Sequence, residues 1–121
     1  MNWTGIGALV ALLGVGTGAF GAHTLKARLS AEMLQVFEVG VRYQMYHAFA
    51  LMVLGLTGWK APAAGWCFLT GTVVFSGSLY VLSMTGIRVL GAVTPVGGVL
   101  FLIGWALLAR AAFTSTRRPN G

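Results

Sequence analysis

Long apolar runs follow one another along this chain of 121 residues, and only short polar segments separate them. A helix that crosses a bilayer needs about 20 mostly apolar residues, so four crossings use about 80 positions and leave little room for a fifth. Only 8% of the residues are charged, whereas soluble domains carry about 25% charged residues. The sequence therefore predicts an all-α integral membrane protein built as a bundle of four transmembrane helices.

The apolar runs predict one transmembrane domain over residues 1–113, with spans at about 3–22, 41–59, 62–85 and 89–109. Residues 114–121 form a polar tail that we expect to be disordered. The second helix is expected to start near Ala31, after the N-cap Ser30, and to end at Gly58. A helix of that length rises about 42 Å, more than the roughly 30 Å of a hydrocarbon core, so its N-terminal part is expected to lie in the membrane interface.

The chain contains two acidic residues, Glu32 and Glu38, and no Asp. This excludes paired-carboxylate hydrolysis, a Ser-His-Asp triad and carboxylate cages for Ca²⁺ or Mg²⁺. The single cysteine, Cys67, provides neither an internal disulfide nor a Cys-rich metal site. We therefore expect no enzymatic activity, no cofactor and no metal site.

The net charge of +6 comes from eight Lys and Arg residues that lie at the ends of the apolar runs. This placement is typical of membrane flanks and not of a nucleic-acid surface, so the expected partner is the lipid bilayer. Four of these residues fall on each side of the membrane, and the positive-inside rule therefore does not decide the orientation. The side of the chain termini carries Lys60, Arg110, Arg117 and Arg118, and the other side carries Lys26, Arg28, Arg42 and Arg88.

Small residues recur in the first span at steps of three and four, which keeps them on one helix face. Another helix backbone can approach closely along such a face, and the sequence leaves open whether that helix belongs to the same chain or to a second copy. In the fourth span, Pro95 is expected to kink the helix six residues after its start. The expected helix-packing positions are Gly7, Ala11, Gly14, Gly18, Gly97 and Gly98.

The densest group of polar side chains lies on the second helix. Glu38 and Arg42 are four residues apart, with the acid on the N-terminal side, which favours an ion pair. Tyr43 and His47 have the same spacing on the neighbouring stripe. Polar groups within a membrane span are costly, so each is a candidate for function. The alternative is that these side chains decorate an interfacial part of the helix.

The two histidines and the third span add further candidates. His23 lies where the first span leaves the membrane, and its approach to His47 would allow a bis-histidine haem or a quinone contact, although no other haem motif is present. Hydroxyl groups in the third span form hydrogen bonds between helices or line a polar pocket that faces His47. The candidate ligand-binding residues are His23, Glu38, Arg42, Tyr43, Gln44, His47, Ser76, Ser78, Tyr80 and Thr94.

Four short motifs carry a resemblance to a known family. They are residues 18–23 (GAFGAH), 42–48 (RYQMYHA), 75–80 (FSGSLY) and 94–98 (TPVGG). In this order they resemble the domain-of-unknown-function family numbered 423, which is similar to the eukaryotic transmembrane protein 256. The resemblance implies four transmembrane helices in a bacterial inner membrane, and it implies no particular reaction.

Two interpretations of function follow. In the first, the protein binds or passes a small solute, a lipid or a proton at a polar site between helices 2, 3 and 4. It would then act as an oligomer, because so small a bundle encloses little volume. In the second, the protein is a non-catalytic accessory or assembly subunit of a larger membrane complex.

Overall fold

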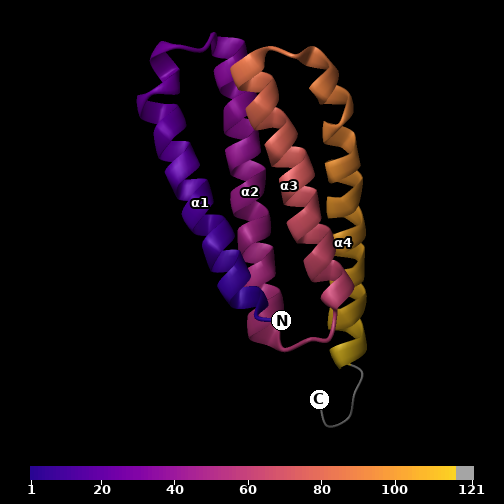
Figure 1. Ribbon diagram of the computed structural model, residues 1–121. Helices are drawn as coiled ribbons and strands as arrows, with labels where there is room; N and C mark the ends of the chain where they lie inside the picture. Colours follow the sequence, from indigo (N-terminus) through magenta and orange to yellow (C-terminus); the bar gives the residue numbers. More distant parts are fainter. Residues whose placement is uncertain (117–121) are drawn as a thin grey trace.

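The computed structural model describes residues 1–116, and over this range the fold is all α, without a strand. Four long helices lie side by side (Figure 1), which confirms the predicted fold class. Two short 3₁₀ helices follow the first and the third of them. The elements are α1 (Trp3–His23), η1 (Leu25–Ala27), α2 (Ala31–Thr57), α3 (Pro62–Thr85), η2 (Arg88–Ala92) and α4 (Thr94–Thr116).

The helices alternate in direction. The lower end of the bundle in Figure 1 holds the first residues of α1 and α3 and the last residues of α2 and α4. Trp3, Trp59 and Trp66 belong to these chain segments, and we call this end the tryptophan end. The opposite end holds η1 and η2.

Local interactions set the ends of α2 and α3. The Oγ of Ser30 accepts a hydrogen bond of 3.2 Å from the backbone N–H of Met33, as expected of an N-cap. Gly58 and Gly86 end the two helices with φ angles of 70° and 74°, a left-handed conformation that glycine adopts without steric cost. Pro62 occupies the first turn of α3, where its missing N–H is not needed.

The start of α4 differs from the expectation. α4 begins at Thr94, and Pro95 lies in its first turn, so the expected kink at Pro95 is wrong. The physical reason is that the first turn of a helix leaves its N–H groups unbonded, and a proline fits there. Residues 88–92 form η2 instead of the start of the span. α4 also includes residues 114–116, expected in the polar tail, while tail residues 117–121 lie outside the described residues.

Three segments are long and apolar enough to cross a membrane: Trp3–Ala27, Pro62–Thr85 and Arg88–Ser115. α2 is not among them although it is the longest helix, with 27 residues, because polar side chains interrupt its apolar sequence. α2 packs against both α1 and α3. The most polar helix therefore lies between two apolar ones.

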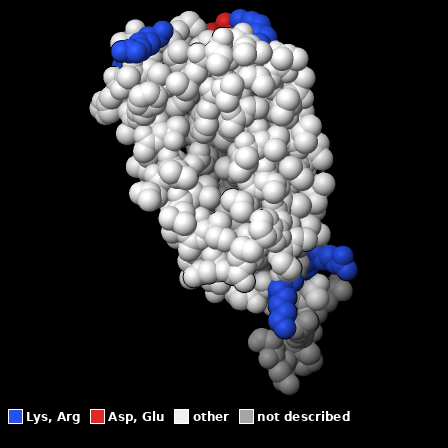
Figure 2. Space-filling view, viewed as in Figure 1, with Lys and Arg blue, Asp and Glu red and all other residues white. Residues whose placement is uncertain are grey.

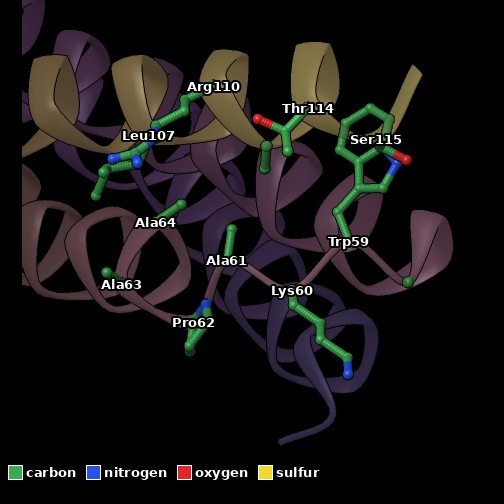
Figure 3. Close-up of a pocket in the computed structure, with 12 residues that line it drawn as sticks. Trp59, Lys60, Ala61, Pro62, Ala63, Ala64, Leu107, Arg110, Thr114 and Ser115 are labelled. Atoms are coloured by element: carbon green, nitrogen blue, oxygen red, sulfur yellow. The ribbon is translucent and has the colours of Figure 1, made fainter. Parts of the chain in front are cut away.

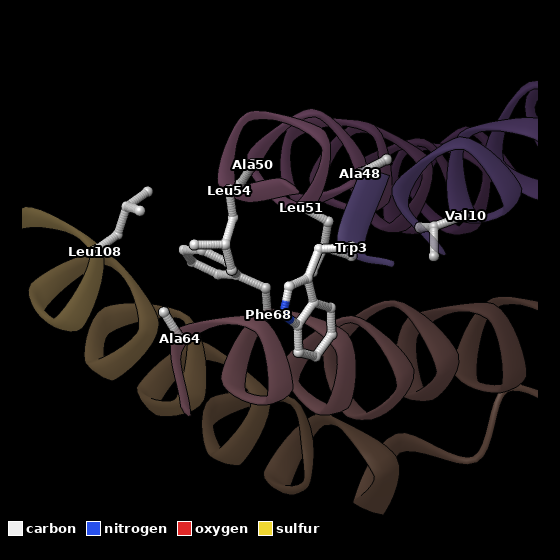
Figure 4. Packing of buried hydrophobic residues seen from close by; sticks show 9 residues of the cluster. All are labelled: Trp3, Val10, Ala48, Ala50, Leu51, Leu54, Ala64, Phe68 and Leu108. Atoms are coloured by element: carbon white, nitrogen blue, oxygen red, sulfur yellow. The ribbon is translucent and has the colours of Figure 1, made fainter. Parts of the chain in front are cut away.

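A core of buried apolar side chains fills the half of the bundle toward the tryptophan end (Figure 4). Leu51 of α2 and Phe68 of α3 are completely buried in it. All four helices contribute, so this core holds the bundle together. Its buried members are Trp3, Val10, Ala48, Ala50, Leu51, Leu54, Ala64, Phe68 and Leu108.

Glycines determine how closely the helices approach. A Cβ atom on Gly7 would lie 2.6 Å from the backbone oxygen of Ala48, and one on Gly97 would lie 2.5 Å from the backbone nitrogen of Phe75. α1 thus lies close to α2 of the same chain, and α4 lies close to α3. A Cβ atom on Gly98 would meet nothing within 4 Å, so Gly98 does not have the packing role expected of it.

The other small residues of α1 also face α2 or the core. A Cβ atom on Gly14 would contact the side chain of Met45, and one on Gly18 would lie 3.2 Å from the side chain of Val41. Ala11 is partly buried against the core. The small-residue face of α1 is therefore used within the chain.

We predict that Gly97→Ala lowers the free energy of unfolding by about 1–3 kcal/mol, because the new methyl group overlaps the backbone of Phe75. Gly98→Ala is the matched control and is expected to change this free energy by less than about 1 kcal/mol, in the stabilising direction, because alanine has the higher helix propensity. Unfolding in detergent, followed by circular dichroism, measures both. Equal losses in the two variants would contradict the close contact at Gly97.

Candidate functional site

Gln44 of α2 connects three helices through its side-chain amide. Its Nε2 donates a hydrogen bond of 3.0 Å to the backbone oxygen of Val10 in α1. Its Oε1 accepts a hydrogen bond of 2.5 Å from the Oη of Tyr80 in α3. The side chain is only 7% exposed, so both ends of a buried polar group have a partner.

The hydroxyl groups of α3 complete this polar layer. The Oγ of Ser76 donates a hydrogen bond of 2.6 Å to the backbone oxygen of Gly40 in α2. The Oγ of Ser78 lies 2.6 Å from the Oγ1 of Thr94 in the first turn of α4. Gly40 allows the close approach, because a Cβ atom there would lie 2.8 Å from the ring of Tyr80. These hydroxyl groups therefore act as contacts between helices.

His47 of α2 uses both of its ring nitrogens. The indole Nε1–H of Trp105 donates a hydrogen bond of 3.1 Å to Nε2 of His47, and an indole only donates, so Nε2 carries no proton. Nδ1 therefore carries the proton and donates it to the backbone oxygen of Tyr43, at 2.7 Å. The imidazole ring also stacks on Phe101 of α4, with ring centroids 3.6 Å apart and an interplanar angle of 7°. In this arrangement neither nitrogen has a free lone pair for a metal or a haem.

The structure does not bring the two histidines together. His23 is exposed at the end of α1. Near it, a Cβ atom on Gly21 would meet the ring of Phe37 in α2. His47 lies ten residues beyond Phe37, which corresponds to about 15 Å along the helix. A bis-histidine site is therefore not formed, and residues 1–116 contain no group of three or more His, Cys, Asp or Glu that could hold a metal ion.

Glu38 and Arg42 lie on the outer face of α2, and the structure has no ion pair between them, contrary to the expectation. An exposed pair at this spacing gains only about 0.3–0.5 kcal/mol, which is too little to hold two long side chains in one geometry. In the described range the one ion pair is instead that of Arg88 with Glu32, at 3.4 Å, and both side chains are exposed.

These two residues belong to a continuous exposed row on α2, which we call the α2 stripe. Its members follow one another at steps of three and four, so they share one face of the helix. The part toward η1 is polar and the part toward the tryptophan end is apolar. The α2 stripe consists of Gln35, Glu38, Arg42, Tyr46, Phe49, Val53 and Leu56, all exposed.

Two hollows lie at opposite ends of the bundle. A groove of about 290 Å³ lies between α1 and α2, and Gly18, Gly21, Phe37, Glu38 and Arg42 are among the residues that line it. A larger cavity of about 490 Å³ lies at the tryptophan end, between the α2–α3 connection and the last turns of α4 (Figure 3). We call the second one the end cavity.

The interior between α2, α3 and α4 has a different character. Within residues 1–116, no buried side-chain nitrogen or oxygen lacks a hydrogen-bond partner. Tyr43, the remaining candidate, is 37% exposed and packs its ring against Phe75, with centroids 4.8 Å apart. The buried polar side chains there thus form hydrogen bonds with one another and with the backbone.

The sequence interpretation did not identify Phe101 and Trp105 as neighbours of His47. Phe101 belongs to the buried face of α4, and Trp105 lies one turn further along the helix. A signal was present, because the buried residues Gly97, Phe101, Gly104 and Leu108 recur at steps of four, three and four. That spacing identifies a buried face but not the residue against which it packs.

Comparisons with known proteins find a family model and several membrane proteins to which the chain is similar. A family model described as "Protein of unknown function (DUF423)" matches residues 17–98, which contain all four motifs quoted above. A UPF0382 membrane protein of Staphylococcus aureus (strain bovine RF122 / ET3-1) is 50% identical over 112 residues, which cover 89% of this chain and 92% of that protein. The UPF0382 membrane protein YwdK of Bacillus subtilis (strain 168) is 49% identical over 113 residues, covering 88% and 92%. No solved structure matches the chain.

We predict that His47→Ala lowers the free energy of unfolding by about 2–4 kcal/mol, because it leaves a void beside Phe101 and deprives the Trp105 indole of its acceptor. His23→Ala is the control, since His23 is exposed, and is expected to change this free energy by less than about 0.5 kcal/mol. Thermal unfolding in detergent, read out by tryptophan fluorescence, measures both. A His47→Ala variant as stable as the wild type would contradict a packing role for His47.

Proposed function

Because the chain belongs to the DUF423 family, whose relatives above are bacterial membrane proteins, we propose that it is a non-catalytic, multi-pass protein of the bacterial inner (cell) membrane. We further propose that it works as an assembled unit and that the α2 stripe is its contact surface. The partner that best fits this surface is a second copy of the chain. The proposal is carried by the outward position of Glu38 and Arg42.

The position of Arg42 along α2 supports a protein partner. Arg42 lies fifteen residues from Thr57 at the tryptophan end, which corresponds to about 22 Å along the helix. A hydrocarbon core of roughly 30 Å that starts near Thr57 therefore contains Arg42. A charged side chain costs about 2.5–3.5 kcal/mol at the centre of such a core on insertion scales, and less at the depth of Arg42, which lies about 8 Å from the far edge. Contact with a protein partner removes part of this cost.

The saturated interior also favours action at the surface. The side chains of Gln44, Ser76 and Tyr80 form hydrogen bonds that join α1, α2 and α3 to one another. A ligand that entered between these helices would have to break those bonds. An assembly subunit, in contrast, binds its partner with its outer faces, so these hydrogen bonds stay intact.

The charges of the α2 stripe are complementary to those of a second copy. Two copies with the same orientation in the membrane place their α2 helices parallel, related by a two-fold axis. Glu38 and Arg42 differ by about 6 Å in height, and packed helix axes lie about 8–10 Å apart. Glu38 of each copy can therefore pair with Arg42 of the other, as charged residues do beside the seam of a parallel coiled coil.

A ligand-binding function is the second candidate, and the groove beside the α2 stripe favours it. Both charged side chains line this groove of about 290 Å³, together with small residues of α1. A small solute, a lipid or a proton would then interact with Glu38 and Arg42 at the protein surface. In this case His47 and Tyr80 would shape the helices without touching the ligand.

We predict that Tyr46→Cys, in a Cys67→Ser background, forms a disulfide-linked dimer in membranes, because Tyr46 lies at the centre of the α2 stripe and is 51% exposed. Val73→Cys in the same background is the control, since Val73 is 65% exposed on α3. Non-reducing gel electrophoresis of oxidised membranes measures both. A Tyr46→Cys variant that stays monomeric, or that links no better than Val73→Cys, would contradict a second copy as the partner.

Charge reversal provides the matching electrostatic test. In the Tyr46→Cys background, Glu38→Arg and Arg42→Glu are each expected to lower the yield of the disulfide-linked dimer. Each substitution places like charges opposite one another in the two copies. The double variant restores opposite charges and is expected to restore the cross-link. Lys26→Glu, outside the stripe, is expected to leave it unchanged. If the wild type stays monomeric and native mass spectrometry finds a bound small molecule that Arg42→Ala loses, the second candidate replaces the first.

A further inference from the structure

The tryptophan end has the features of a membrane–water interface. Trp3 begins α1, Trp59 follows α2 and Trp66 lies in the first turns of α3. The rings of Trp3 and Trp66 meet edge to face, with centroids 5.6 Å apart. Tryptophan is enriched at the level of lipid headgroups because its ring is apolar and its N–H is polar. Trp3 belongs to the buried core, whereas Trp66 is 47% exposed, so Trp66 is the residue that indicates headgroup depth at this end of the bundle.

The end cavity opens at this level. Its volume of about 490 Å³ falls within the roughly 300–1,000 Å³ of small-molecule sites. One wall is the α2–α3 connection with Trp59 and Lys60, and the other is α4 with Arg110, Thr114 and Ser115, as Figure 3 shows. Pro62 and Ala63 from the first turn of α3 also line it, and the positive end of a helix dipole lies there.

Among the described residues, the charged side chains that line the end cavity are all basic. Lys60 lies on one wall and Arg110 on the opposite wall, and in Figure 3 the exposed side chain of Lys60 points away from α4. The two acidic side chains of the sequence, Glu32 and Glu38, lie in the half of α2 away from the tryptophan end. The lower end in Figure 2 accordingly shows blue side chains without red ones. The electrostatic field at the cavity thus attracts anions.

We infer that the end cavity binds a phosphate group, and specifically the phosphodiester of an anionic phospholipid headgroup. Lys60 and Arg110 supply the opposite charge, and the hydroxyl groups of Thr114 and Ser115 supply donors. Basic pockets between helices at the membrane surface recognise anionic lipids in this way. This inference does not depend on the α2 stripe, which lies on another part of the molecule.

The apolar part of the lining favours a lipid over free phosphate. Leu107 and Ala111 of α4 and Ala64 of α3 form the inner wall of the cavity. Free phosphate gains nothing from such a wall, whereas the glycerol and the first methylene groups of a lipid bury apolar surface against it. Trp59 also lines the cavity and is partly buried against the core, so its ring adds to this apolar surface.

The test is native mass spectrometry of the protein released from nanodiscs that contain equal amounts of phosphatidylglycerol and phosphatidylcholine. We predict that the wild type retains phosphatidylglycerol at least about fivefold over phosphatidylcholine, which is the preference expected for one basic residue near a membrane surface and therefore a lower limit for two. The variant Lys60→Gln/Arg110→Gln is expected to lose this preference. The control Lys26→Gln/Arg28→Gln removes two exposed charges at the opposite end and is expected to keep it.

Three outcomes would overturn the inference. Equal loss in the two double variants would assign retention to general surface charge. Displacement of phosphatidylglycerol by millimolar inorganic phosphate, with phosphate retained in its place, would assign the cavity to free phosphate. If Lys60→Gln/Arg110→Gln retains as much phosphatidylglycerol as the wild type, the lipid binds outside the end cavity. Circular dichroism of each variant checks that it is folded, and none of these results bears on dimerisation through the α2 stripe.

Discussion

The packing of this bundle depends on the side-chain amide of Gln44, because a buried amide in apolar surroundings must find partners for both of its ends. A buried polar group without a hydrogen bond costs roughly 1–3 kcal/mol in proteins. Gln44 meets this requirement by donating to Val10 of α1 and accepting from Tyr80 of α3. The short connections place α2 beside α1 and α3, and its buried amide forms a hydrogen bond with each of these neighbours.

Small residues make these hydrogen bonds geometrically possible. Gly40 allows the hydroxyl of Ser76 and the ring of Tyr80 to approach the α2 backbone, and Gly97 allows α4 to approach α3 at Phe75. Three of the four motifs that carried the family resemblance are thus parts of one set of contacts. Residues of the second and third motifs meet at Gln44 and Tyr80, and residues of the third and fourth meet at Ser78 and Thr94. The hydrogen bonds of the polar layer therefore depend on the close packing of the helices that the glycines allow.

This packing places the candidate functions on the surface of the bundle. The interior polar groups are satisfied by one another, while the charged side chains remain outside. The α2 stripe presents Glu38 and Arg42 toward η1, and the end cavity presents Lys60 and Arg110 at the tryptophan end. The two surfaces differ in chemistry, since the first carries both signs of charge and the second carries only positive charge. The first therefore suits a protein surface with the same two charges, and the second suits an anion.

The sequence by itself determined the number of helices, their approximate limits and the family, because long apolar runs and capping residues such as Ser30 and Gly58 act locally. It also identified the polar residues of α2 and α3. Only the tertiary structure decided which of them face inward, since Gln44 and His47 are buried while Glu38 and Arg42, on the same helix, are exposed. It alone paired His47 with Trp105 and separated it from His23. The physical reason is that a hydrogen bond between helices depends on their relative rotation and height, and packing of the whole bundle sets both.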